Sequence, residues 1–245
     1  MIIYEGPSLL DGQQIVVIAT GIKSKSSNGK TGGMIQTWIL LRDIDPREAN
    51  KSGADYGICG DCPHRGKATT ALDKVLAAER TCYVILFQAP LNVWKTYHRG
   101  NYDRAVDSEA IAAVGKDRKV RLGSYGDPAA VPAYVWQALL SKSIGRTGYS
   151  HQSGLANADF VADIMMISAD NLAMAQGAWA NGHRTFRVID SVDDMDANEV
   201  LCPASKEAGE RTNCENCGLC AGSSIQAKSI AIVAHGNGAK YATTK

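Results

Sequence analysis

The apolar positions of this chain fall into short runs that alternate with amphipathic stretches. Runs rich in β-branched residues and bounded by glycine or polar turns predict strands, and apolar residues repeating every three or four positions predict helices. We expect strands at 14–20, 37–41, 83–87, 119–124, 147–151, 163–168, 185–190 and 229–236. We expect helices at 68–80, 90–100, 107–115, 131–142 and 170–181.

From residue 107 onward the predicted helices and strands alternate regularly. This alternation is typical of parallel strands joined by helical crossovers. The count of about six to eight strands suffices for a complete or partial (β/α) barrel. The length suits one hydrophobic core. We therefore predict an α/β fold of barrel type, with one domain over residues 1–245 and a cysteine-rich metal-binding segment at about 200–224.

Charge and composition narrow the classes of partner. The chain has 26 basic and 25 acidic residues and a formal net charge of +1, so it has no global field for nucleic acid or membrane. The first twenty residues lack the basic start and apolar run of a signal peptide, and no run is long enough to span a membrane. Seven cysteines, mostly in CxxC pairs, indicate metal ligation in a reducing compartment. We expect a cytoplasmic protein with no membrane contact.

Four cysteines near the C-terminus carry the strongest chemical signal. Their segment contains almost no apolar side chains, so hydrophobic burial cannot order it. Two overlapping CxxC pairs with a fourth cysteine upstream would hold one tetrahedral ion or the corners of an iron–sulfur cube. The alternative is a loop of free or disulfide-bonded thiols. The predicted ligands, for zinc or for a 4Fe-4S cluster, are Cys202, Cys214, Cys217 and Cys220.

Three more cysteines, Cys59, Cys62 and Cys82, lie in the N-terminal third. A closed metal site needs four protein ligands, whereas a reactive cluster keeps one position open. Three plus four cysteines therefore suggest one open site and one closed site. Two alternatives stand beside this one. His64 would complete a structural zinc site, or Cys82 would be a buried core thiol.

Polar residues follow several predicted strands, at the edge where α/β folds bind ligands. The strand at 119–124 runs into Gly126 and Asp127, and Asp127 is the leading candidate for a ligand contact; the alternative is that it caps the next helix. His235 is a candidate proton carrier or a structural histidine. Arg184 and Arg187 are candidates for clamping a phosphate or carboxylate. Further candidates at strand ends are Ser150, His151, Ser168 and Asp190.

Several segments resemble the gene-product-88-like proteins of phages, a family without an established activity. The matching pieces are SSNGKTG, the first CxxC followed by TCYV, NVWKTYHRG, VRLGSYGDPAAVP, GYSHQ, and CPAS with CENCGLC. The resemblance covers most of the chain. It implies a protein of the host cell cytoplasm.

That family in turn resembles the radical S-adenosylmethionine barrels. The resemblance implies a partial (βα)6 fold in which three cysteines hold an open 4Fe-4S cluster that binds the amino-acid end of S-adenosylmethionine. YGDP at 125–128 is similar to the turn that contacts the amino group of that cofactor, which implies a cofactor role for Gly126 and Asp127, with Ser150 and Ser168 at neighbouring strand ends. The usual CxxxCxxC is absent. The implied substrate is a nucleic-acid base or a related small molecule.

Two other functions remain as alternatives. The chain is also similar to zinc-containing guanine transglycosylases, which insert 7-deazaguanines into DNA. That resemblance implies Asp127 and Asp190 as nucleophile and base. Independently of it, His235 at its strand end is a further candidate catalytic residue. The last alternative is a binding module stapled by metal, with no catalytic activity.

Overall fold

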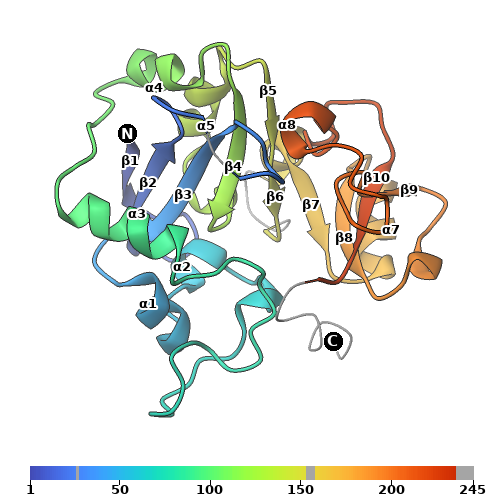
Figure 1. Cartoon of the computed structure of the whole chain (residues 1–245), viewed down its shortest axis with the longest axis horizontal. Helices are drawn as coiled ribbons and strands as arrows, with labels where there is room; N and C mark the ends of the chain where they lie inside the picture. Colours follow the sequence, from blue (N-terminus) through green and yellow to red (C-terminus); the bar gives the residue numbers. More distant parts are fainter. Residues whose placement is uncertain (26–27, 153–157, 236–245) are drawn as a thin grey trace.

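The structure is a computed structural model that describes residues 1–25, 28–152 and 158–235. The β-branched runs of the first half form one five-stranded sheet (Figure 1), in the order β1-β2-β3-β4-β5. β2 pairs antiparallel with both β1 and β3, and β4 pairs parallel with both β3 and β5. The strands are β1 (Ile2–Pro7), β2 (Gln14–Thr20), β3 (Ile35–Leu41), β4 (Lys119–Tyr125) and β5 (Gly145–Thr147).

The second half forms another five-stranded sheet, in the order β6-β7-β8-β10-β9, and every pairing in it is parallel. Its strands are short because helices and loops return the chain after each one. The strands are β6 (Tyr149–Ser150), β7 (Met166–Ala169), β8 (Thr185–Ile189), β9 (Glu199–Leu201) and β10 (Ser229–Val233).

Gly148 is the seam between the two sheets, because it alone separates β5 from β6. Its N–H donates to the carbonyl of Cys220 (3.2 Å), and its carbonyl accepts from the N–H of Met166 (3.0 Å). A side chain at Gly148 would lie 3.0 Å from Cβ of Leu122 and 3.1 Å from Cβ of Met165. The parallel strands from β3 to β9 therefore follow one another across the seam.

The predicted α/β class is confirmed. Among the described residues, no pairing closes the strands into a complete barrel. The helices lie outside the strands and at their ends (Figure 1). They are α1 (Pro46–Ser52), α2 (Tyr56–Cys59), α3 (Ala89–His98), α4 (Ser108–Gly115), α5 (Ala133–Leu140), α6 (Ala158–Ile164), α7 (Leu172–Ala180) and α8 (Cys214–Cys217), with 3-10 turns at Pro63–Arg65, Pro128–Ala130 and Val192–Asp194.

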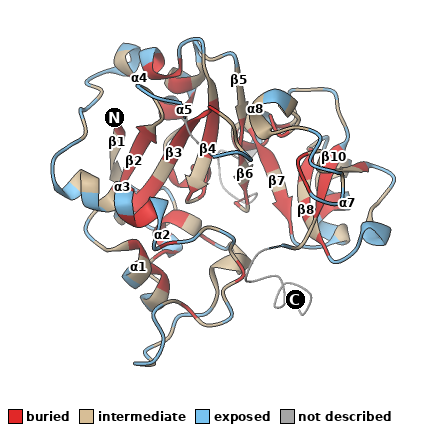
Figure 2. Ribbon diagram, viewed as in Figure 1, coloured by how far each residue is buried: buried red, intermediate tan, exposed pale blue. Residues whose placement is uncertain are grey.

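The main hydrophobic core packs around the first sheet. Ile15, Ile39 and Leu122 are fully buried there, and α5 adds Trp136, whose Nε1 donates to the carbonyl of Pro128. The second sheet has only a small apolar cluster of Met166, Cys220 and Ile230. Strands of both sheets are buried in Figure 2. Buried side chains around the second sheet include apolar ones, such as Met165 and Ile232, and polar ones, such as Thr185 and Ser229.

Two predicted elements are wrong. Residues 68–80 form no helix, because a bridge pairs Lys67 with Ala78 and leaves Leu72 99% exposed. Residues 83–87 form no strand. Leu86 is buried there while Tyr83 and Phe87 are exposed.

Other elements are shifted, divided or additional. The strand expected at 163–168 starts at Met166, because α6 ends at Ile164. The strand expected at 147–151 is divided at Gly148. The sequence analysis did not predict β1, β9, α1, α2, α6 or α8.

Candidate metal centres

Predicted site residues from several strands meet at the carboxyl edge of the parallel strands. Asp127 follows β4, while Ser150 ends β6 and His151 comes directly after it. The hydroxyl of Ser150 donates to Oδ1 of Asp127 (2.7 Å), and the N–H of His151 donates to Oδ2 (2.8 Å). The expectation that these strand ends converge is therefore confirmed for Asp127, Ser150 and His151.

Asp127 also caps the following 3-10 turn, since Oδ1 accepts from the N–H of Ala129 at 2.9 Å. Burial raises the pKa of Asp127, while the hydrogen bonds from Ala129, Ser150 and His151 oppose that rise. The capping interpretation is thus confirmed. A carboxylate has about four acceptor positions. Three of them are occupied here, so a ligand contact by Asp127 stays a prediction.

Gly126 brings this turn against the first cysteine loop. Its φ is +82°, and a Cβ there would lie 2.7 Å from Cβ of Ile39 and 2.9 Å from the carbonyl oxygen of the same residue. Only glycine fits. Directly after it, the N–H of Asp127 donates to the carbonyl of Ile58 (2.5 Å), next to Cys59.

The three N-terminal cysteines come together although twenty residues separate Cys62 from Cys82. Cys59 ends α2, and the N–H of Cys62 donates to its carbonyl (3.2 Å). The N–H of Cys82 donates to the carbonyl of His64 at 2.9 Å, which fixes it beside the CxxC loop. Burial raises the pKa of the Cys59 thiol, and the neighbouring Asp55, Cys62 and Cys82 add to that rise.

A second set of possible ligands borders this loop. His64, His151 and Asp170 each offer one ligand atom, and these atoms lie within 4.8 Å of one another. Nε2 of His151 lies 3.3 Å from Oδ1 of Asp170 and 4.0 Å from Sγ of Cys62. Burial disfavours the charged imidazole, but Asp170 and Cys62 outweigh burial and raise the pKa of His151 to about 10. Sequence reasoning placed His151 at a strand end but did not pair it with Asp170.

Buried polar atoms without a partner also point to this edge. Within the described ranges, Tyr125 Oη and Arg80 Nε are the buried side-chain atoms that find no hydrogen bond. Burial raises the pKa of Tyr125, and Cys59, Asp55 and Cys82 contribute, so its side chain neighbours the cysteine loop. An additional group with acceptor atoms beside these cysteines would satisfy such donors.

The four C-terminal cysteines are gathered by contacts of their segment with the first sheet. The N–H of Cys214 donates to the carbonyl of Lys30 (2.9 Å), and Glu215 accepts from the N–H of Gly33 (2.7 Å). Burial raises the pKa of the Cys202 thiol, to which Cys214 and Cys217 contribute. Burial likewise raises the pKa of Cys220 to about 12, against the influence of neighbouring Tyr149 and Arg121.

All seven cysteines are free thiols. Among the described residues, no three cysteine sulfurs lie within 4.8 Å of one another. A tetrahedral zinc ion and an iron–sulfur cube both take thiolate ligands. The choice between zinc and a cluster therefore stays a prediction for both cysteine sets.

The remaining candidates lie apart from this convergence. Asp190 is exposed after β8, and no hydrogen bond joins it to Asp127 in the described part of the chain; Ser168 is buried on β7. His235 follows β10, with Nε2 3.1 Å from Nζ of Lys30 and its ring stacked on Tyr83 at 6.3 Å between centroids. Their predicted roles stay predictions.

The predicted arginine clamp is formed differently from the expectation. Arg187 is paired with buried Glu199 at 2.6 Å. Arg184 donates to carbonyl oxygens of the loop after Cys220. Both guanidinium groups are therefore occupied by protein partners.

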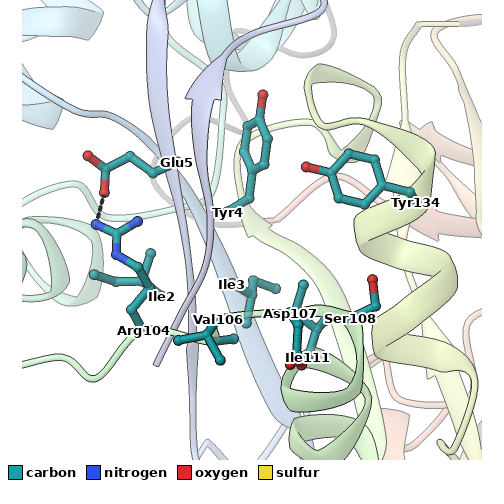
Figure 3. Close-up of a pocket in the computed structure, with 11 residues that line it drawn as sticks. Ile2, Ile3, Tyr4, Glu5, Arg104, Val106, Asp107, Ser108, Ile111 and Tyr134 are labelled. Atoms are coloured by element: carbon teal, nitrogen blue, oxygen red, sulfur yellow. Dashed lines mark hydrogen bonds and ion pairs between the residues drawn. The ribbon is translucent and has the colours of Figure 1, made fainter.

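A separate pocket of ≈ 230 Å³ lies between β1 and α4 (Figure 3). Ile3 and Ile111 form part of its apolar wall, and the ion pair of Glu5 with Arg104 lies at its rim. None of the predicted site residues lines it.

Comparisons with protein-family models, with curated proteins and with solved structures found no match for this chain. Over the described ranges, no helix has the length and apolar character needed to cross a membrane.

Proposed function

We propose that the protein is an iron–sulfur enzyme similar to the radical S-adenosylmethionine barrels. The observation that carries the proposal is the meeting of Cys59, Cys62 and Cys82 at the carboxyl edge of the parallel strands, beside the glycine turn that follows β4. The unpartnered hydroxyl of Tyr125 beside these cysteines supports an additional group with acceptor atoms, such as the sulfides of a cluster.

The order of the parts along the chain supports the same class. The cysteine loop follows β3, which begins the parallel series, and the next strand, β4, ends in Gly126 and Asp127. The series then continues through β5/β6, β7, β8 and β10 with helices between most of its strands. This is the sequence of parts expected of an incomplete (βα)6 barrel with its reaction centre at the carboxyl edge.

The chain supplies the contacts that such a centre requires. Three thiolates would hold a cube with one iron open, and a reduced 4Fe-4S cluster supplies a single electron. Asp127 retains one acceptor position on Oδ2, which would receive the amino group of S-adenosylmethionine. Gly126 lets the turn pack against Ile39 and so places Asp127 beside the cysteine loop. The proposed substrate is a nucleic-acid base or a related small molecule.

The first experiment is iron and acid-labile sulfide analysis of protein purified without oxygen. We expect a brown protein with about four to eight irons and matching sulfide. Replacement of Cys59, Cys62 and Cys82 by alanine should remove one cluster and leave the other. Reductive cleavage of S-adenosylmethionine, measured as methionine release, should disappear with that cluster. A colourless protein containing one or two zinc ions would overturn the proposal.

A second candidate for the same edge is a single divalent cation held by His64, His151 and Asp170. The specific support is that their ligand atoms lie within 4.8 Å of one another. Two imidazoles and a carboxylate suit zinc or non-haem iron(II). One metal per chain, without sulfide and lost in His64→Ala but kept in Cys59→Ala, would favour this candidate.

Zinc analysis also bears on the remaining alternatives. A base transglycosylase would use Asp127 and Asp190 and would need no redox cofactor. A binding module stabilised by metal would use neither of these two aspartates. Zinc at the C-terminal cysteines, with base exchange lost in Asp190→Asn, would favour the transglycosylase. Zinc without any effect of Asp127→Asn or Asp190→Asn on function would favour the binding module.

A further inference from the structure

We propose that Arg121 and Arg184 are the built-in counter-charge of an anionic metal–thiolate centre at Cys202, Cys214, Cys217 and Cys220. The inference rests on one part of the proposed function, the assignment of a metal to these four cysteines. It holds for zinc and for an iron–sulfur cluster alike.

Arg121 is a buried cation without a carboxylate partner. It is 6% exposed, and none of the ion pairs among the described residues includes it. Its Nη2 donates to the hydroxyl of Tyr83 (3.1 Å), and its guanidinium carbon lies 4.4 Å from the centre of the Tyr149 ring. These contacts position the charge but do not neutralise it.

The face of β4 that carries Arg121 is turned toward the cysteine segment. Lys119 lies two residues earlier on the same strand, so both side chains share one face. Nζ of Lys119 donates to the carbonyl of Glu215, next to Cys214. Tyr149, against which Arg121 packs, also lies close enough to Cys220 to influence the pKa of its thiol.

Arg184 approaches the same thiol from the second sheet. It is 7% exposed and likewise has no carboxylate among its described partners. Nη1 donates to the carbonyls of Leu219 (2.8 Å) and Gly222 (3.0 Å), on either side of Cys220. Two buried guanidinium groups therefore flank Cys220 from opposite sheets.

Arg187 on β8 shows how this protein otherwise treats a buried arginine. It is 6% exposed and forms two hydrogen bonds with Glu199, at 2.6 and 2.9 Å. A buried charge is costly unless an opposite charge accompanies it. Arg121 and Arg184 lack such a carboxylate; Arg121 lies near the thiols of Cys214 and Cys220, and Arg184 near that of Cys220.

Metal binding would supply the negative charge that the two buried guanidinium groups lack. When a divalent ion binds, the four thiols release their protons to solvent and four S–metal bonds form. Four thiolates and one divalent ion leave two negative charges on the complex. Those two charges match the two guanidinium groups. Oxidation and reduction take no part in this step.

The test uses the full chain, freed of metal and titrated with Zn²⁺ against a chromophoric chelator. Loss of a neighbouring partner typically lowers metal affinity by about 10- to 100-fold. We expect that loss for Arg121→Met, a much smaller one for Arg121→Lys, and none for Arg187→Met combined with Glu199→Gln, the matched control that leaves no buried charge unpaired. Arg184→Met should also weaken zinc binding, provided that circular dichroism shows an intact fold.

Thermal unfolding of the metal-free variants gives a second measurement. Arg121→Met should weaken zinc binding, but it should not lower the Tm of the metal-free protein. Without metal, Arg121→Met removes an uncompensated charge, so its Tm should equal or exceed that of the wild type. Failure of this variant to fold without metal would contradict the proposal, as would unchanged zinc affinity. If the wild type binds no zinc that depends on the four cysteines, the assignment of the metal centre is wrong instead.

Discussion

The two sheets of this protein are stabilised by different means. Around the first sheet, apolar side chains such as Ile15, Leu122 and Trp136 form an extended core. Around the second, the apolar cluster is smaller, and polar contacts add to it: Trp179 Nε1 donates to Thr185 (3.0 Å) and to Ser229 (2.8 Å). We expect the first half to be stabilised mainly by apolar burial, and the second half also by a metal bound at its four cysteines.

Metal removal is the most direct test of whether the two sheets differ in their dependence on metal. Structural metal in small sites contributes on the order of 10 kcal/mol to folding. We expect chelation, or Cys217→Ala, to lower hydrogen-exchange protection in β7, β8 and β10 while the protection of β2 and β3 stays unchanged. Equal protection in both sheets after metal removal would show that the polar contacts suffice.

A core truncation in the first sheet should have the next largest effect. Trp136 is 1% exposed and packs in the main cluster. Replacing a buried aromatic residue by alanine costs about 3–5 kcal/mol. Trp136→Ala should lower the free energy of unfolding by that amount with or without metal, measured in urea. Val106→Ala is the control, because Val106 is 84% exposed and its loss should change stability by less than about 0.5 kcal/mol.

The ion pair of Arg187 with Glu199 gives the corresponding measurement in the second sheet. Both side chains are buried, so removing one partner leaves a charge unpaired. Arg187→Met should destabilise the protein by about 3 kcal/mol. Adding Glu199→Gln should restore part of that loss in a double-mutant cycle. If the cycle shows no coupling, packing rather than charge explains this pair.

The pH dependence of the metal-free protein tests the edge where the halves meet. The pKa of His151 is about 10 in the folded protein, because Asp170 and Cys62 favour its charge more than burial opposes it. A raised pKa stabilises the fold fully below about 6.5, the ordinary histidine value. That stability is lost as the pH rises toward 10. Unfolding of His151→Gln at several pH values should show a weaker decline than the wild type between pH 7 and 10.

The sequence predicted elements whose pattern is local. The runs that form β2, β3 and β4 and the Asp107-capped α4 are recognisable because each is bounded by its own turns or caps. Residues 68–80 have helical composition, yet Leu72 finds no apolar surface to cover, and tertiary context overrides propensity.

The candidate site likewise contains parts that local sequence predicts and parts that depend on long-range contacts. CxxC spacing is local, so the pairing of Cys59 with Cys62 and the C-terminal set could be predicted as metal ligands. Cys82 reaches them through a hydrogen bond to His64, and His151 meets Asp170 because β6 and β7 are parallel neighbours. The seam at Gly148 depends on contact with Cys220. Such long-range contacts carry no signal in a single sequence.

Asp127 offers the finest test, because it joins the two halves. Its carboxylate, placed by β4 of the first sheet, accepts from Ser150 and from the N–H of His151 at the end of β6 in the second. Asp127→Asn can keep an oxygen toward Ala129 and Ser150, but its amide would then face the N–H of His151. Loss of that one bond should cost about 1–2 kcal/mol.

Ser150→Ala is the matched variant, since it removes one hydrogen bond at the same seam and keeps the carboxylate. If Asp127 serves only as a cap, both variants should lose similar stability and keep similar affinity for S-adenosylmethionine, measured by equilibrium dialysis on cluster-loaded protein. If the carboxylate contacts the amino group of the cofactor, Asp127→Asn should weaken binding by about tenfold or more while Ser150→Ala does not. The structural and functional roles of one residue are then separated at the point where the two sheets meet.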